Sequence, residues 1–188
     1  MNVSDAPLMH EPERRLCLMG AKHAGKSSAG AALARLYGGR CLDLDELLTV
    51  QTGETPRQLY LQSPTLLHTA ESAALATALA VKTERLLVIA AGGGIIDNPA
   101  ACLHLQAADL ILVCLAISAQ AAWRRISAGP LPPFLQTDNP QESHRILHER
   151  RTNQYRLLAH LVIAAERKSP DQIAHEIMQR INDERPCS

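Results

Sequence analysis

One short stretch limits what this chain can fold into more than any other. Residues 20–28, G-A-K-H-A-G-K-S-S, match the pattern G-x-x-x-x-G-K-[ST]. The apolar run 16–19 predicts a strand before the motif, and the run 29–37 predicts a helix after it, which is the context that the motif requires. In such a loop, backbone N–H groups surround the phosphates of a nucleotide, and the helix points its positive end at them. The chain is therefore predicted to bind a nucleoside triphosphate.

The residues of this loop have separate roles in the prediction. Lys26 can reach the β- and γ-phosphates, and the hydroxyl of Ser27 can hold Mg²⁺. A nucleoside triphosphate and Mg²⁺ are therefore the expected ligands of the loop. The residues expected to surround the phosphates are Gly20, Ala21, Lys22, His23, Ala24, Gly25, Lys26, Ser27 and Ser28.

Strand-like and helix-like segments alternate along the rest of the chain. Such alternation predicts an α/β fold with a parallel sheet, whose ligands bind at the carboxyl ends of the strands. We expect five strands flanked by helices. The predicted strands are 15–19, 40–44, 85–90, 110–115 and 161–164, and the predicted helices are 26–37, 46–51, 66–82, 119–127 and those that begin near 56, 99, 140 and 170.

Length and local composition indicate one domain without a membrane segment. The 188 residues fit a single domain over 15–188, preceded by a flexible N-terminus over 1–14. Residues 128–139 are rich in proline and have no helical or strand period, which is typical of a lid. No apolar run approaches the roughly 20 residues that span a bilayer, and the first residues do not form a signal peptide. The expected location is cytoplasmic, and the expected state is a monomer.

The charge balance argues against two classes of partner. Lys plus Arg and Asp plus Glu number 19 each, so the formal net charge is +0. Nucleic acids and anionic membranes select basic surfaces, and we expect neither as a partner. The five cysteines are scattered and form no C-x-x-C pair, so neither a disulfide framework nor a zinc site is expected.

Two acids and a glycine run follow predicted strands. Asp43 and Asp45 are two residues apart, and alternate residues of a strand point to the same side. Both carboxylates are therefore expected to face the nucleotide, one supporting Mg²⁺ and the other accepting a hydrogen bond from a substrate hydroxyl. The alternative is that one acid of the pair, Asp45 in particular, simply caps the short helix that follows. Gly92, Gly93 and Gly94 carry no side chains, so a small substrate can lie against their backbone.

In order and spacing, these motifs resemble those of the shikimate kinases over nearly the whole chain. The resemblance implies the P-loop kinase fold with a lid. It also implies ATP-dependent phosphoryl transfer to a hydroxyl of shikimate or of a closely related polyhydroxylated carboxylic acid. The matching segments are the phosphate loop 20–28, Asp43-Leu-Asp45, Leu67-His68-Thr-Ala-Glu71, Ile89-Ala-Ala-Gly-Gly-Gly94, Pro132-Pro133-Phe134-Leu135 and Arg151-Thr-Asn-Gln-Tyr155.

The resemblance also implies roles for individual residues. Lys26 and Asp45 would be catalytic, Lys26 by stabilising the transferring phosphoryl group and Asp45 by orienting the attacking hydroxyl. Ser27 and Asp43 would organise Mg²⁺, and Arg125 would lie near the nucleotide. Arg151 would pair with the carboxylate of the acceptor, a small-molecule carboxylic acid. The residues expected to bind this acceptor are Asp45, His68, Gly92, Gly93, Gly94 and Arg151.

The sequence departs from the family pattern in three places, of which His23-Ala24, where the phosphate loop of the family usually has a glycine, is tolerable for the general motif. His68 stands where the family has an arginine that helps to bind the substrate carboxylate, and an imidazole does not replace a bidentate guanidinium. Pro132 stands where the lid has an arginine, which removes a cation that would meet the triphosphate. Three hypotheses therefore stay open. They are a kinase for shikimate or a relative such as aminoshikimate or quinate, a gluconate-kinase-like sugar acid kinase, and a nucleotide-binding regulatory protein with weak or no kinase activity.

Three side chains on the helix that begins near 140 are given no role. His144 and His148 lie one turn apart but have no third ligand, so they are predicted to form a solvated face rather than a zinc site. Arg150 is expected to point away from the site that Arg151 faces.

Overall fold

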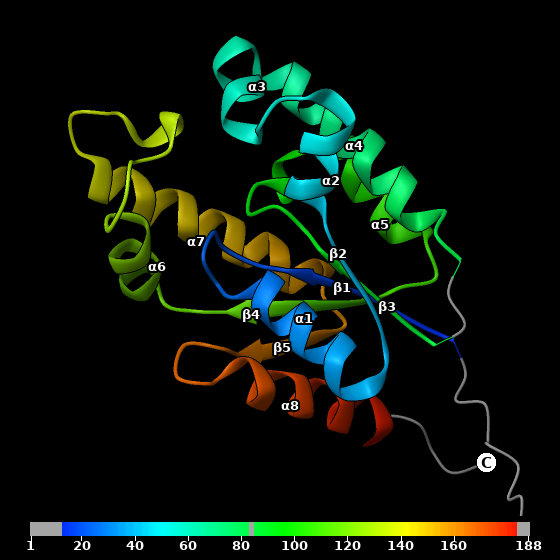
Figure 1. Ribbon diagram of the computed structural model, residues 1–188. Helices are drawn as coiled ribbons and strands as arrows, with labels where there is room; N and C mark the ends of the chain where they lie inside the picture. The colour runs from blue at the N-terminus through cyan, green and yellow to red at the C-terminus, as the bar shows by residue number, and fades with distance from the viewer. Residues whose placement is uncertain (1–12, 83–84, 184–188) are drawn as a thin grey trace, which may run out of the picture.

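The computed structural model describes residues 13–82 and 85–183 and contains a five-stranded sheet with helices on both faces (Figure 1). The strand order is β2-β3-β1-β4-β5, and every neighbouring pair runs parallel. The five-stranded parallel sheet predicted from the sequence is confirmed. The strands are β1 (Arg14–Met19), β2 (Gly39–Asp43), β3 (Leu86–Ala90), β4 (Ile111–Ala116) and β5 (Leu161–Ala164).

Helices cover the sheet as two layers. The helices are α1 (Lys26–Tyr37), α2 (Leu44–Thr52), α3 (Pro56–Gln62), α4 (Pro64–Leu79), α5 (Pro99–Ala107), α6 (Ala119–Ile126), α7 (Pro140–Leu158) and α8 (Pro170–Asp183), with 3₁₀ turns η1 (Ile95–Asp97) and η2 (Pro133–Leu135). Leu16 and Leu18 of β1 pack with α1, α6 and α8, whereas Cys17 and Met19 pack with the layer that contains α2, α4, α5 and α7. All four residues are 0% exposed, as expected for a parallel strand covered on both faces. A ligand can therefore reach the central strand only at its ends.

Short polar side chains set where several helices begin. Thr55 and Gln58 form a capping box at the start of α3, and Ser63 accepts from the N–H of Thr65 at the start of α4. The helix predicted over 66–82 therefore begins earlier, at Pro64, and it ends at Leu79. Asn98 and Ser118 cap α5 and α6 in the same way, because a side-chain oxygen satisfies an N–H group that has no partner within the helix.

The described part of the chain begins one residue before β1. The sequence predicted a flexible N-terminus over 1–14. Residues 1–12 lie outside the described residues, and Arg14 already belongs to β1. The second strand runs one residue earlier than predicted, from Gly39 to Asp43. That shift places Asp43 at the last position of the strand and Asp45 in the following helix.

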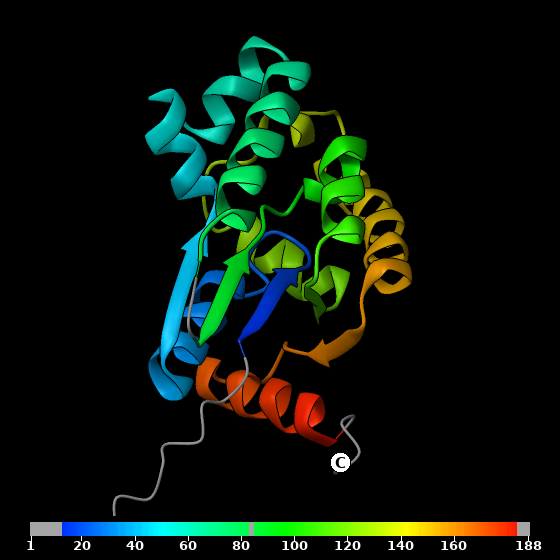
Figure 2. The ribbon, with the colours of Figure 1, turned by 90° about the vertical axis from the view of Figure 1, so that its right-hand side faces the viewer.

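The lid segment, residues 128–139, connects α6 with α7 and contains η2. Its Phe134 meets Tyr60 of α3 edge to face, with ring centroids 5.9 Å apart. Nη1 of Arg57 in α3 donates to the carbonyl oxygen of Leu131 at 2.9 Å. Figure 2 shows β1, β2 and β3 pointing toward the end of the molecule where α3 lies. The lid segment therefore contacts α3 at the carboxyl-end side of the sheet.

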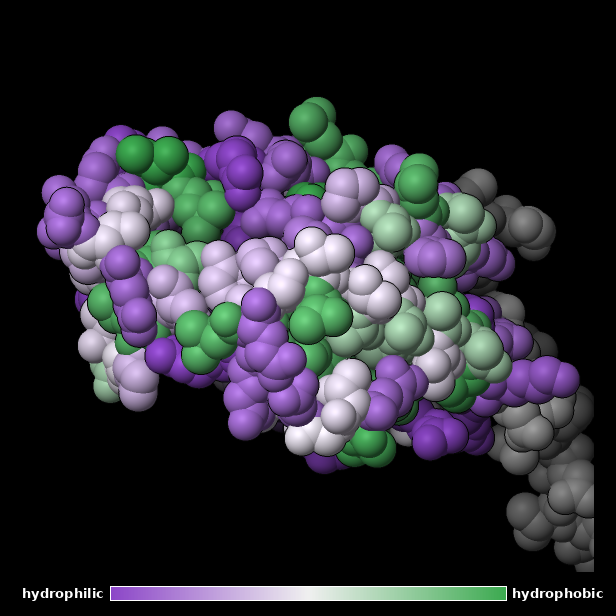
Figure 3. Space-filling view, turned by 90° about the horizontal axis from the view of Figure 1, so that it is seen from above, coloured by the Kyte–Doolittle hydropathy of each residue, from purple (hydrophilic) through white to green (hydrophobic). Residues whose placement is uncertain are grey.

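None of the helices within residues 13–82 and 85–183 combines the length and the low polarity that crossing a bilayer requires. Seen from above, the face that includes α3 carries hydrophilic and hydrophobic residues side by side (Figure 3). Neither kind covers this face alone.

Candidate active site

The phosphate loop joins the end of β1 to the start of α1. Gly25, with a φ of 95°, and His23, with a φ of 60°, both have left-handed backbone, which glycine adopts at little cost. Lys26 is the first residue of α1 and is only 8% exposed. Its Nζ donates to the carbonyl oxygens of Gly20 and Ala21 at 3.0 and 2.9 Å. The loop therefore holds the ammonium group of Lys26 against its own backbone, at the start of the helix.

The charged form of Lys26 is disfavoured in this position. Burial lowers its pKa from 10.5 to about 8, the carboxylates of Asp45 and Asp43 oppose the shift, and Lys22 adds to it. Part of the Lys26 population is therefore neutral above pH 8 in the free protein. The negative charge of a triphosphate would favour the protonated form and raise the pKa again.

We therefore expect Mg-ATP binding to take up a proton at roughly pH 8.5, and its affinity to fall as the pH rises above about 8. The sign follows because the bound state holds the proton more tightly than the free state. Titration calorimetry in two buffers with different ionisation enthalpies measures the uptake. Lys22→Met is the matched control and should keep most of the uptake, because burial lowers the pKa of Lys26 more than Lys22 does. Lys26→Met should lose the uptake. Equal heats for the wild type in both buffers would contradict this expectation.

Asp43 ends β2 and caps α2. Its Oδ1 accepts from the N–H groups of Asp45 and Glu46 at 2.9 and 3.4 Å, and its Oδ2 accepts from Oγ of Ser27. The prediction that strand alternation turns Asp43 and Asp45 to one side is wrong, because Asp45 already belongs to α2. The alternative that one acid caps this helix is confirmed, but the acid is Asp43 rather than Asp45. Both carboxylates nevertheless line the same cavity.

Ser27 and Asp43 suit a Mg²⁺ ion that arrives with a nucleotide. They offer a hydroxyl and a carboxylate oxygen in direct contact, and Mg²⁺ prefers hard oxygen donors of this kind. Within the described part of the chain, no group of three or more His, Cys, Asp or Glu side chains could hold a metal ion. Mg²⁺ usually binds through one or two carboxylates, with waters and phosphates completing its shell, so two protein ligands fit.

Asp45 lies over the glycine run that follows β3. A Cβ at Gly92 would lie 2.8 Å from Oδ1 of Asp45, and a Cβ at Gly93 would lie 2.8 Å from the backbone nitrogen of Lys22. Glycine is required at Gly93, because the backbone of the phosphate loop approaches it more closely than a Cβ allows, whereas at Gly92 the close atom is the end of the Asp45 side chain, which could turn aside. Partial burial between these walls raises the pKa of Asp45, the Asp43 carboxylate adds to the rise, and Lys26 opposes it. Asp45 is therefore a stronger proton acceptor than an ordinary aspartate.

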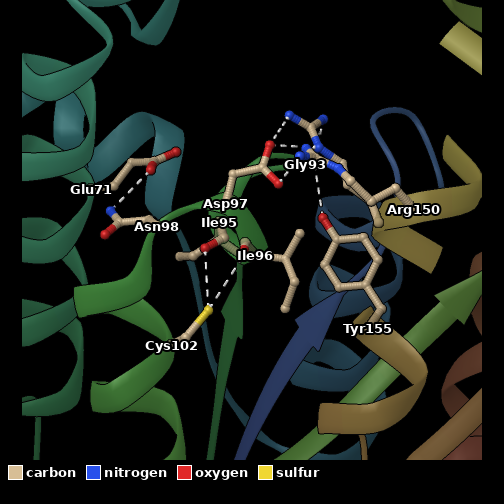
Figure 4. Close-up of polar contacts among 10 residues, drawn as sticks. Glu71, Gly93, Ile95, Ile96, Asp97, Asn98, Cys102, Arg150 and Tyr155 are labelled. Atoms are coloured by element: carbon tan, nitrogen blue, oxygen red, sulfur yellow. Dashed lines mark hydrogen bonds and ion pairs between the residues drawn. The ribbon is translucent and has the colours of Figure 1, made fainter. Parts of the chain in front are cut away.

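Arg151 reaches the glycine run from α7. Its Nε and Nη2 donate to Oδ2 of Asp97 at 3.0 and 2.6 Å, and its Nη1 donates to the oxygen of Gly93 at 3.1 Å. Oη of Tyr155 donates to the same Gly93 oxygen at 2.8 Å (Figure 4). The guanidinium carbon lies 5.3 Å from the ring centroid of Phe134, and the side chain is 15% exposed. Contacts on several sides therefore hold this guanidinium in place where it lines the cavity.

Arg150 also turns toward this site. Its Nη2 donates to Oδ1 of Asp97 at 2.9 Å (Figure 4), and its side chain lines the cavity. The expectation that Arg150 points away is wrong, because Asp97 of η1 attracts both neighbouring arginines. No motif in the sequence marks Asp97, so this shared pairing could not be found before the fold.

A buried carboxyl group lies close to Asp45. Glu71 of α4 is 7% exposed, and burial raises its pKa from 4.5 to about 7. The hydrogen bond from Nδ2 of Asn98, 3.2 Å from Oε2 of Glu71 (Figure 4), opposes the rise in the pKa. The Asp45 carboxylate adds to the rise. The same Nδ2 donates to the backbone oxygen of His68 at 2.7 Å. Near neutral pH, Glu71 can therefore donate a hydrogen bond as an acid or accept one as a carboxylate.

These groups surround one cavity with a volume of about 1000 Å³. It lies where the ends of the central strands meet α3, α4, α7 and the lid segment. Tyr60, Arg57 and Asp97 also line it, and sequence analysis missed all three. The predicted site residues that line it are Lys22, His23, Gly25, Lys26, Ser27, Ser28, Asp43, Asp45, His68, Gly92, Gly93, Gly94 and Arg151.

Four predicted site residues do not line the cavity: Gly20, Ala21, Ala24 and Arg125. The oxygens of Gly20 and Ala21 bind the Lys26 ammonium group, as described above. Nη1 of Arg125 donates to the backbone oxygen of His23 at 2.7 Å, and its Nη2 donates to that of Glu166 at 3.3 Å. Arg125 therefore supports the phosphate loop by linking it to the segment after β5.

The two histidines of α7 are not solvated. His144 and His148 are 5% and 8% exposed, so the prediction of a solvated face is wrong. The ring of His144 lies 5.5 Å from that of Trp123 in α6 and 5.7 Å from that of His148. Burial lowers the pKa of both imidazoles. This face of α7 is thus covered by α6, which local sequence spacing did not reveal.

Comparison with known proteins adds independent findings. A family model described as shikimate kinase matches residues 22–182. A shikimate kinase of Aromatoleum aromaticum is 29% identical over 167 residues, which cover 88% of this chain and 93% of that protein. A shikimate kinase of Lactococcus lactis subsp. cremoris is 30% identical over 168 residues, with 88% and 96% covered. The structure of shikimate kinase from Acinetobacter baumannii in complex with shikimate is similar with a TM-score of 0.81 and 25% identity, covering 94% of this chain and 96% of that one.

Proposed function

This chain belongs to the shikimate kinase family, and we propose that it transfers the γ-phosphoryl group of ATP to a hydroxyl of shikimate or of a closely related polyhydroxylated carboxylic acid. As a member of this family it is a phosphotransferase that acts on an alcohol group. The similar structure from A. baumannii holds shikimate, which supports an acceptor of this class. The cofactors in the proposal are ATP and Mg²⁺.

One observation carries the proposal: Lys26, Asp45 and Arg151 line a single cavity. They come from the phosphate loop, from α2 and from α7. A triphosphate at the loop, an acceptor hydroxyl at Asp45 and an acceptor carboxylate at Arg151 would then share one continuous space. Such an arrangement suits phosphoryl transfer, in which positioning and electrostatic stabilisation supply most of the catalysis.

In the proposed reaction, Asp45 accepts a hydrogen bond from the attacking hydroxyl and orients its oxygen toward the γ-phosphorus. Its raised pKa lets the carboxylate take the hydroxyl proton as the new O–P bond forms and ADP leaves. Lys26 neutralises negative charge on the oxygens of the transferred group. Ser27 and Asp43 would hold Mg²⁺, which would supply further neutralisation of the negative charge of the triphosphate.

Of the two family arginines that bind the acceptor carboxylate, this chain keeps Arg151 and has His68 in place of the other. Arg151 is held by Asp97 and the Gly93 oxygen, whereas the half-buried His68 offers an imidazole. A carboxylate bound by one guanidinium is held less tightly than one bound by two. Selection among acceptors would therefore depend more on hydrogen bonds from the ring hydroxyls to Asp45 and Glu71. For this reason the proposal includes aminoshikimate and quinate beside shikimate.

Turnover with a panel of acceptors tests the proposal. Purified protein is given Mg-ATP and shikimate, aminoshikimate, quinate or gluconate, and the release of ADP is measured. We expect one of the three cyclic acids to give the highest kcat/KM. The kcat/KM for the carboxamide of that acceptor should be at least about 30-fold lower than for the acid, because a neutral amide cannot form an ion pair with Arg151.

The same panel separates the rival hypotheses. Turnover with gluconate alone would indicate a sugar acid kinase. Binding of ATP without turnover on any acceptor would indicate a nucleotide-binding regulatory protein. Equal kcat/KM values for the acid and its carboxamide would remove Arg151 from the acceptor site.

A further inference from the structure

The lid segment brings no positive charge to the cavity. Residues 128–139 contain no Lys, Arg or His, and their one charged side chain is the carboxylate of Asp138. Negative charge on a phosphoryl group in transfer is stabilised by cations placed around it. A lid of prolines and apolar residues cannot supply one from its own side chains. A cation on this side of the cavity must therefore come from another element.

Arg57 of α3 is such a cation. Its side chain lines the same cavity as Lys26 and Asp45. Its Nη1 donates to the carbonyl oxygen of Leu131 at 2.9 Å, and Leu131 directly precedes Pro132. The guanidinium of Arg57 therefore lies at the part of the lid segment that lacks a basic side chain.

A chain of ring contacts extends from α3 across the lid segment. Tyr60, one turn after Arg57, lies edge to face on Phe134 at a centroid distance of 5.9 Å. Phe134 in turn lies 5.3 Å from the guanidinium carbon of Arg151. The element that carries Arg57 is thus connected, through the lid segment, to the arginine proposed to bind the acceptor.

The charge of Arg57 is not neutralised by a carboxylate of the described residues. Its hydrogen bond goes to an uncharged backbone oxygen. Arg150 and Arg151, by contrast, share the carboxylate of Asp97. A guanidinium has five N–H donors in one plane, so a bond to Leu131 leaves donors for an anion in the cavity.

We propose that Arg57 donates hydrogen bonds to the phosphoryl group during its transfer and supplies from α3 the positive charge that the lid segment lacks. The inference rests on the proposed function, because it needs a phosphoryl group in this cavity. Lys26 approaches from the phosphate loop and Arg57 from α3, so two cations reach the cavity from separate walls. Arg57 is exposed, and its charge acts more strongly once bound substrates displace water around it.

Arg57→Met and a second substitution on the lid test this role. We expect Arg57→Met to lower kcat by about 100-fold, with the acceptor KM and the Kd of Mg-ADP within about three-fold of the wild type. The affinity for Mg-ADP with aluminium fluoride, which mimics the phosphoryl group in transfer, should fall in step with kcat. Pro132→Arg in the Arg57→Met background should raise kcat again by at least about ten-fold, because it places a guanidinium on the lid without restoring the bond to Leu131.

Arg145→Met is the matched control. Arg145 is an exposed arginine of α7 that pairs with Glu142 and Glu149, and its replacement should leave kcat unchanged. A melting temperature for Arg57→Met close to that of the wild type shows that the variant folds.

The possible failures are distinguishable. A wild type without turnover on any acceptor overturns the proposed function and this inference with it. An active wild type with Arg57→Met within about two-fold of its kcat overturns the role of Arg57 alone. A loss confined to the acceptor KM also overturns it, because Arg57 would then bind the carboxylate of the acceptor. Failure of Pro132→Arg to restore activity would assign the loss to the bond with Leu131, which is a structural role.

Discussion

Asp45→Asn is expected to lower kcat by about 10²- to 10⁴-fold, which is the usual loss when a general base is removed. Asparagine keeps the size of the side chain, but its amide cannot take the proton of the attacking hydroxyl. The Kd of Mg-ATP should stay within about three-fold, because Asp45 lies outside the phosphate loop. Steady-state kinetics with the best acceptor and calorimetry with a non-hydrolysable ATP analogue measure the two effects.

Glu46→Gln is the matched control for this prediction. Glu46 is the next residue of α2, is exposed and does not line the cavity, so removal of its charge should change kcat little. If Asp45→Asn and Glu46→Gln lost equal activity, a general loss of negative charge near the loop would explain both. An active Asp45→Asn variant would remove Asp45 from the catalytic step.

Arg151→Met is expected to raise the KM of the acceptor by at least about 30-fold. Breaking a hydrogen-bonded charge pair at a binding site costs about 2–5 kcal/mol, and each 1.4 kcal/mol is about a factor of ten. The Kd of Mg-ATP should change little, because the side chain contacts Asp97 and the Gly93 oxygen rather than the phosphate loop. Acceptor saturation curves and nucleotide calorimetry separate the two substrates.

Two further variants sharpen the interpretation of Arg151. Arg156→Met removes an exposed arginine of the same helix that does not line the cavity, and it should leave the acceptor KM unchanged. His68→Arg adds the second guanidinium of the family pattern, so it should lower the KM for shikimate if the single guanidinium limits binding. Equal losses of acceptor and nucleotide affinity in Arg151→Met would place Arg151 outside the acceptor site.

Local patterns predicted most of the elements. The alternation of apolar runs with helical segments indicated each strand of the sheet, and the last strand, Leu161–Ala164, has the bounds predicted for it. The phosphate loop could be located because its motif occupies one continuous stretch, which includes Lys26 and Ser27 and lies directly between a strand and a helix. Predictions of this kind succeed because the hydrogen bonds that define a turn or a helix start connect residues only a few positions apart.

Reasoning about faces was less successful. Asp43 and Asp45 were assigned to one side of a strand, yet β2 ends at Asp43, whose carboxylate caps α2. His144 and His148 were assigned to solvent because no third metal ligand was found for them, yet both are buried and the ring of His144 lies beside that of Trp123 in α6. In both cases the element was predicted and its surroundings were not, because a helix face is buried or exposed according to what packs on it.

The sequence by itself determined the phosphate loop, the α/β class and the motifs that place the chain in its family, since each depends on residues that are neighbours in the chain. Only the tertiary structure decided the strand order β2-β3-β1-β4-β5, the sharing of Asp97 by Arg150 and Arg151, and the reach of Arg57 to Leu131 across 74 positions. The physical reason is that such contacts arise where separate helices and strands are packed together. Their geometry depends on the whole core rather than on any one stretch of chain.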